Sequence, residues 1–255
     1  MKTRLLVVLI ALGALAPFCL GQAVSKPLRK KPVKGQELKT EKADDQALPV
    51  PAKVACPVVK DTWIYAFRPD SNYGGGFGWK DLTDPTQDLT VAKMFLGFGG
   101  TDKKIILLEF DISKLPKGRE AKRAVVRLYN DFAGSSAATA VAAKLVMTKW
   151  DEMKVTWRTA PRIDTAATST TTLKGAINYS QPGVWYEWEV TKLINFWKVS
   201  NKPCYGIALD PVGDYGVDRD FVCKEYKAKA QYAPVLAVEY EPVQGKAETK
   251  ETKTQ

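Results

Sequence analysis

The feature that most constrains the fold is a succession of short apolar segments separated by turn residues. Between residues 54 and 240 these segments are rich in β-branched and aromatic residues, and Gly, Pro, Asp and Asn cluster between them. Such segments are typical of β-strands. No long amphipathic helical pattern interrupts them, so the sequence predicts an all-β domain.

The pattern predicts about nine strands and one short helix. Strands are expected at Thr62–Phe67, Val91–Phe98, Lys104–Asp111, Arg123–Asn130, Val141–Thr148, Val184–Val190, Cys204–Leu209, Phe221–Tyr226 and Val235–Tyr240. The helix is expected at Thr191–Lys198, with Thr191 as its N-cap and Leu193, Ile194 and Trp197 facing inward. Many short strands favour a two-sheet antiparallel β-sandwich of the jelly-roll type, and a barrel is the alternative.

The segment Ile105–Phe110 indicates how the core is arranged. Because side chains alternate between the two faces of a strand, Ile106, Leu108 and Phe110 share one face. Ile105, Leu107 and Glu109 share the other. The first set is the better candidate for the core between the sheets.

The chain begins with the layout of a secretory signal peptide. Lys2 and Arg4 precede an apolar stretch from Leu5 to Ala16, which is shorter than the roughly 20 residues of a membrane-spanning helix. We expect residues 1–21 to be removed on export. The mature chain is then expected to have no integral membrane segment and to be secreted, with an extracellular, periplasmic or cell-surface location.

Two further segments are expected to be disordered: a basic linker over residues 22–53 and a tail over residues 241–255. Both are polar and show no apolar periodicity, so they cannot bury enough surface to offset the entropy of the chain. Residues 54–240 remain as one ordinary domain.

The net charge of +10 suggests a nucleic-acid partner, but much of the excess lies outside the domain. Residues 54–240 hold 25 basic and 21 acidic residues. A nucleic-acid-binding domain is expected to have a concentrated basic surface. We therefore expect no nucleic-acid partner.

The chain contains no histidine, which excludes Ser-His and Cys-His nucleophilic systems and His-ligated zinc sites. Paired-carboxylate chemistry remains open because it needs only two Asp or Glu residues. The candidate pairs are Glu109 with Asp111, Asp151 with Glu152, and Glu187 with Glu189. The last pair alternates with Trp188 and Val190, which places both carboxylates on the solvent face. We expect a protein that is not an enzyme.

Three cysteines, Cys56, Cys204 and Cys223, follow the predicted signal peptide, which itself contains Cys19. Cys204 and Cys223 are symmetric about Gly213–Asp214, so a hairpin there would bring them face to face. We expect a Cys204–Cys223 disulfide with Cys56 free. Three unpaired buried thiols are the alternative.

No cofactor is expected, although a structural calcium ion is an alternative at an Asp-rich loop. Asp210, Asp214, Asp218 and Asp220 crowd this loop, and dense carboxylates can hold calcium. Their spacing matches no calcium motif, and Asp is also a frequent turn residue. A solvated hairpin is the favoured interpretation.

The domain resembles the bacterial and archaeal extracellular modules called DNRLRE domains, grouped with carbohydrate-binding module family 96. The resemblance lies in blocks that follow the family's order: Asp61–Ile64, Ser71–Gly74, Leu107–Pro116, Trp150–Trp157, Trp188–Ile194, Tyr205–Leu209 and Pro234–Tyr240. The chain departs from the pattern at Cys223-Lys224-Glu225, where a Ser-Arg-Glu-like run is usual, and in the longer stretch Gly74–Thr90. Trp150 and Trp157 are expected to be packing residues under one corner of the sandwich.

The resemblance implies a non-catalytic carbohydrate-binding module, since such domains are accessories of polysaccharide-degrading or cell-surface proteins. Characterised relatives bind acidic polysaccharide such as alginate, so the expected partner is a polysaccharide, with an acidic one as the first candidate. Two alternatives remain: a structural or adhesive surface protein, and a histidine-free polysaccharide lyase or glycosidase.

The first candidate for a sugar-binding site is the glycine-rich loop from Tyr73 to Lys80. Sugar recognition uses exposed aromatic faces, and anionic sugars add lysine or arginine. The candidate residues are Tyr73, Trp79 and Lys80 in the loop and Lys93, Lys103 and Lys104 near it. The alternative is that Phe77 and Trp79 fold back under the loop as a minor core.

Overall fold

The computed structural model describes residues 52–75, 93–97, 102–178, 180–200, 203–213 and 218–241. Its elements, in chain order, are β1 (Lys53–Tyr65), β2 (Lys93–Leu96), β3 (Lys104–Phe110), β4 (Arg123–Ala133), β5 (Thr139–Val146), β6 (Ile163–Leu173), β7 (Val184–Glu189), α1 (Thr191–Ser200), β8 (Ile207–Val212), β9 (Arg219–Val222), the 3-10 helix η2 (Lys227–Tyr232) and β10 (Val235–Glu239).

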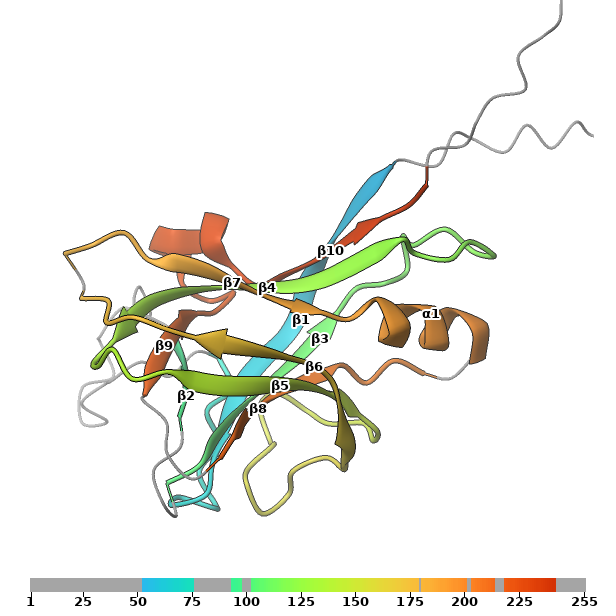
Figure 1. Cartoon of the computed structure of the whole chain (residues 1–255). Helices are drawn as coiled ribbons and strands as arrows, with labels where there is room; N and C mark the ends of the chain where they lie inside the picture. The colour runs from blue at the N-terminus through green and yellow to red at the C-terminus, as the bar shows by residue number, and fades with distance from the viewer. Residues whose placement is uncertain are drawn as a thin grey trace, which may run out of the picture. The chain divides into compact units, whose positions relative to one another are not determined.

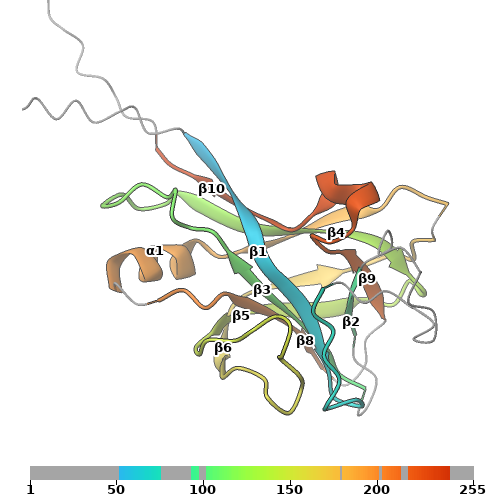
Figure 2. The same ribbon diagram turned by 180° about the vertical axis from the view of Figure 1, so that it is seen from behind.

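The strands form two antiparallel sheets packed face to face. Sheet A contains β2, β9, β4, β10, β7 and the first part of β1. Sheet B contains the rest of β1 with β3, β8, β5 and β6. Figures 1 and 2 show β4 and β10 in one layer and β5 and β8 in the other. The predicted all-β sandwich with one short helix is confirmed.

Strand β1 belongs to both sheets. Its residues 53–57 pair with β10 in sheet A, and residues 58–65 pair with β3 in sheet B. The register shifts between Val58 and Lys60, and Val59 is exposed there. An extra residue in one strand bends that strand and increases its twist. The bulge therefore lets one strand leave the first sheet and enter the second.

The core lies between the two sheets, as the alternation in β3 predicts. Ile106, Leu108 and Phe110 are buried in the large cluster between the layers. Ile105 and Leu107 face the other way and are buried in a smaller cluster with Trp150, while Trp157 packs against its edge. The packing role predicted for the two tryptophans is confirmed.

Trp188 of β7 links the sheets across the core. Its ring is fully buried, and its indole Nε1–H donates a hydrogen bond of 3.0 Å to the carbonyl of Val141 in β5. A buried tryptophan needs such a partner. Glu187 and Glu189, on either side of it, are exposed as predicted.

Helix α1 buries Leu193, Ile194 and Trp197 as predicted, but Thr191 is not its N-cap. The first helical bond runs from the Ile194 N–H to the Val190 carbonyl, at 3.0 Å. The Thr191 hydroxyl instead accepts a hydrogen bond of 2.7 Å from the backbone N–H of Ala124, which ties the helix to β4. In the described part of the chain, no helix is long and apolar enough to cross a membrane.

The structure does not form the predicted Cys204–Cys223 disulfide. Cys56, Cys204 and Cys223 are all free. The expected hairpin does not exist, because β8 pairs with β3 and β5 in sheet B whereas β9 pairs with β2 and β4 in sheet A. The two cysteines therefore do not face each other across a ladder.

Residues 52–241 are expected to give three titratable thiols per chain in denaturant. Burial raises the pKa of Cys56 to about 11 and that of Cys204 to about 12, and only the thiolate reacts readily. The thiols should thus react slowly in the folded protein. Counting them with a chromogenic disulfide reagent checks this.

The matched variant Cys204→Ser should lower the count from three to two. A parent that shows one thiol, with the count rising to two in the variant, would instead establish a disulfide that includes Cys204.

Candidate functional site

The predicted sugar loop is described only at its start. Tyr73 stacks on Trp63 of β1, with ring centroids 3.8 Å apart and an interplanar angle of 21°. Trp63 is buried in the core between the sheets. One face of Tyr73 is therefore occupied by the protein itself. Trp79 and Lys80 lie outside the described residues.

The three lysines predicted beside the loop have carboxylate partners. Lys93, only 5% exposed, lies 3.2 Å from Asp131 and 3.6 Å from Asp220. The Lys104 side chain is 8% exposed and lies 2.8 Å from Asp218. Buried charges require such pairing.

Lys103 lies 2.5 Å from Asp210, and Asp210 also forms an ion pair with Lys144 at 2.7 Å. The candidate calcium ligands Asp210 and Asp218 are thus counterions of lysines, while Asp214 lies outside the described residues. Neither belongs to the cluster of carboxylates that could hold a metal ion in the described part of the chain.

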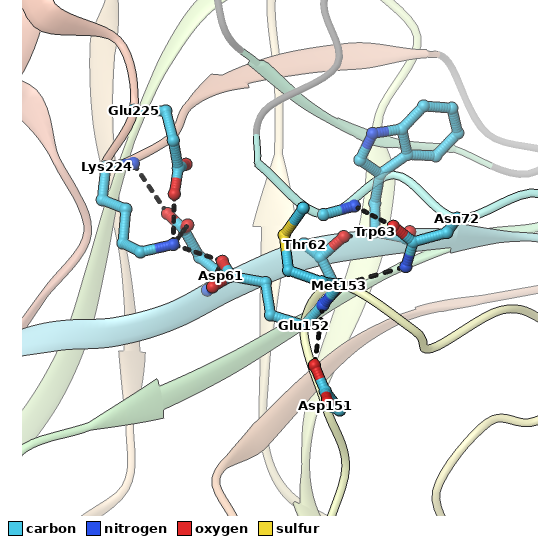
Figure 3. Close-up of polar contacts among 10 residues, drawn as sticks. Asp61, Thr62, Trp63, Asn72, Asp151, Glu152, Met153, Lys224 and Glu225 are labelled. Atoms are coloured by element: carbon cyan, nitrogen blue, oxygen red, sulfur yellow. Dashed lines mark hydrogen bonds and ion pairs between the residues drawn. The ribbon is translucent and has the colours of Figure 1, made fainter.

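That cluster gathers Asp61, Glu152 and Glu225 around the ammonium group of Lys224 (Figure 3). Asp61 lies in β1, Glu152 in the loop between β5 and β6, and the other two follow β9. Their carboxylate oxygens are within 4.8 Å of one another. Lys224 Nζ contacts all three, at 3.2 Å in the case of Asp61.

Backbone hydrogen bonds hold this cluster in place. The Lys224 N–H donates to the Asp61 carboxylate at 2.8 Å, and the Asp61 N–H donates to the Glu152 carboxylate at 2.9 Å. Asn72 donates to the carbonyls of Glu152 and Val155, at 3.0 and 2.7 Å. The loop after β1 therefore fixes the segment that carries Glu152.

Gly74 allows this close approach. A Cβ atom at this position would lie 2.0 Å from the carbonyl oxygen of Glu152. The backbone N–H of Gly74 donates a hydrogen bond of 3.2 Å to the side-chain oxygen of Asn72. No residue with a side chain fits there without moving the backbone. The Asn-Tyr-Gly run is therefore a docking element for the Glu152 loop.

Burial and the neighbouring Glu225 raise the pKa of Asp61 to about 7, although Lys224 opposes this shift. Burial would lower the pKa of Lys224, but Asp61, Glu152 and Glu225 raise it above its usual value. Three carboxylates share one ammonium group, so the cluster carries excess negative charge and holds a proton readily.

The arrangement suits a structural anchor better than a catalytic or metal centre. Asp61 is 1% exposed, so a polysaccharide cannot reach it, and the ammonium group of Lys224 stands where a cation would bind. The cluster ties β1, the loop between β5 and β6 and the segment after β9 together. The sequence did not predict this cluster, although the run Cys223-Lys224-Glu225, noted there as a departure from the family pattern, supplies two of its members.

Several of the other candidate carboxylates also have cationic partners, whereas the Asp111 carboxylate accepts a hydrogen bond from the backbone N–H of Ser113. Glu187 lies 2.9 Å from Arg123 and 3.0 Å from Arg127. Glu109 lies 2.7 Å from Lys60. Asp151 is exposed and accepts hydrogen bonds from its own loop. The structure brings Glu152 together with Asp61 rather than with Asp151.

A model of carbohydrate-binding module family 96 matches residues 52–240, a range that runs from the start of β1 to just beyond β10. The chain therefore belongs to carbohydrate-binding module family 96. This confirms the resemblance inferred from the sequence blocks. No curated protein matches the chain.

Replacing Lys224 with methionine is expected to destabilise the fold by about 3 kcal/mol at pH 7, because three carboxylates then lack their counterion. The folded-state pKa of Asp61 is raised from 3.8 to about 7, so protonated Asp61 favours the folded state. This contribution of protonated Asp61 to stability is fully present below pH 4 and is lost as the pH rises towards 7. Denaturant unfolding should therefore show that Lys224→Met lowers the free energy of unfolding by less at pH 4 than at pH 7.

The control is Lys53→Met, which removes an exposed ion pair with Glu239 and should cost less than about 1 kcal/mol at either pH. Equal stability losses for the two variants would contradict the anchoring role of Lys224.

Proposed function

We propose that this protein is an exported, non-catalytic module that binds polysaccharide. The observation that carries the proposal is the family match, which extends over the whole β-sandwich. The signal-peptide pattern before residue 22 supports a secreted, extracellular or cell-surface location.

The absence of catalysis is supported by the histidine-free sequence and by the state of the carboxylates. Glycosidase chemistry needs two carboxyl groups that flank the substrate. Asp61 is buried, and Glu152 and Glu225 contact Lys224. Glu187 and Glu109 form ion pairs with Arg and Lys residues. These groups are arranged to neutralise cations of the protein.

We further propose that an acidic polysaccharide is preferred. The support is the excess of basic residues between residues 54 and 240, including the exposed Lys117, Lys149 and Lys192. Lys93, Lys103 and Lys104 are paired with carboxylates. The preference would therefore arise from the electrostatic field of the domain's net positive charge. Lys80 and Trp79 remain candidates in the sugar loop.

Affinity electrophoresis of residues 52–241 through gels with alginate, pectate or a neutral glucan tests both proposals. At least one polysaccharide should retard the domain. Retardation by the acidic polymers should weaken from 0.1 to 1 M salt, as the screening length falls from about 10 to about 3 Å. Neither reducing ends nor unsaturated products should appear.

The control for catalysis is the isosteric double variant Glu187→Gln with Glu189→Gln, which removes both negative charges and keeps the side-chain size. If the parent released products and this variant did not, the domain would be an enzyme using those carboxylates. A parent retarded by no polysaccharide would favour a structural or adhesive role.

A further inference from the structure

The outer face of sheet A carries an aromatic surface remote in sequence from the predicted sugar loop. In the antiparallel register, Tyr129 of β4 is opposite Trp185 of β7, and Arg127 is opposite Glu187. Opposite residues of a ladder point to the same face. The neighbouring Leu128 is buried between the sheets, so these four side chains face away from the core.

Three rings form this surface. Tyr129 lies beneath, with its ring stacked on Tyr232 at 4.1 Å and meeting Trp185 edge-on at 5.4 Å. The rings of Trp185 and Tyr232 are 6.2 Å apart and inclined at 51°. Tyr129 is buried, whereas Trp185 and Tyr232 are half-buried. Tyr232 ends η2, which lies on the side of sheet A away from sheet B (Figure 1).

A glycine stands next to Trp185 on this face. The N–H of Gly183 donates to the Tyr129 hydroxyl at 2.7 Å. A Cβ atom there would lie 2.4 Å from the Asn130 carbonyl oxygen and 2.6 Å from the Tyr129 ring. Residue 183 must therefore be glycine. No side chain at this position covers the indole of Trp185.

Polar groups with balanced charge border the rings. The Arg127 guanidinium lies over one face of the Trp185 ring, 4.9 Å from its centre, and its Nε is 3.0 Å from Glu187. On the other side, Lys229 lies 2.9 Å from Asp131 and is one-third exposed. Partly exposed aromatic rings beside fixed hydrogen-bonding groups present an apolar face with a polar edge.

We propose that Trp185 and Tyr232 form a platform on which a pyranose ring of the polysaccharide packs by its C–H face. Arg127 and Glu187 would then be placed to hydrogen-bond the sugar hydroxyls at its edge. This inference rests on the proposed polysaccharide-binding function and names a surface for it. Because the bordering charges are paired, the contribution of the platform to affinity is independent of salt concentration. The electrostatic attraction between the basic domain and an acidic polymer does depend on it.

The experiment uses residues 52–241 and a polysaccharide that retards the parent domain. Trp185→Ala and Tyr232→Ala should each lower affinity by about tenfold, the scale expected when a central aromatic contact is removed. The loss should be the same at 0.1 and 1 M salt. Trp185→Leu keeps apolar bulk for folding and should bind as weakly as Trp185→Ala.

Phe67→Ala is the matched control, because Phe67 is an aromatic residue with 66% exposure on the loop after β1; its loss should leave affinity unchanged. Unchanged affinity in Trp185→Leu and Tyr232→Ala, with a parent that binds, would overturn the platform and leave the proposed function intact. A parent that binds no polysaccharide would overturn both. Sedimentation showing a dimer that Trp185→Leu dissociates would assign this face to a second copy of the chain.

Discussion

The structure depends on one strand that serves two sheets. β1 pairs with β10 in sheet A, passes a bulge at Val58–Lys60, and pairs with β3 in sheet B. Its second part carries Trp63 into the core and Asp61 into the cluster around Lys224. Because one continuous backbone links the layers, loops from both sheets can be fastened to it. The buried Trp188 adds a second link between the layers.

Local pattern was sufficient to predict most of the fold, and its failures have different causes. The alternation in β3 and the inward residues of α1 follow from sequence periodicity. Strand β6 was missed because its residues are mainly Thr, Ala and Ser, and many are exposed on both faces. The disulfide prediction failed because β8 and β9 are near in sequence but belong to different sheets. Strand partners distant in sequence are set by packing, which a local pattern does not contain.

The candidate site was harder to predict for the same reason. Lys93 and Lys104 look like ligand-binding cations in the sequence, yet their charges are matched by Asp131 and Asp218, both distant along the chain. The cluster around Lys224 and the rings around Trp185 also combine segments from different strands. The family resemblance was recognisable because it depends on short blocks. Which surface meets the ligand depends on exposure and on paired charges, and these appear only in the folded structure.

Hydrogen exchange of residues 52–241, with and without a polysaccharide that retards the domain, tests most directly where the module meets its ligand. Bound ligand slows exchange of the amides whose local opening it suppresses. The account predicts added protection in β7 (Val184–Glu189) and η2 (Lys227–Tyr232), with little change in α1. Protection confined to residues 73–80 and 93–104, with none in β7 or η2, would contradict it and place the ligand on the sugar loop.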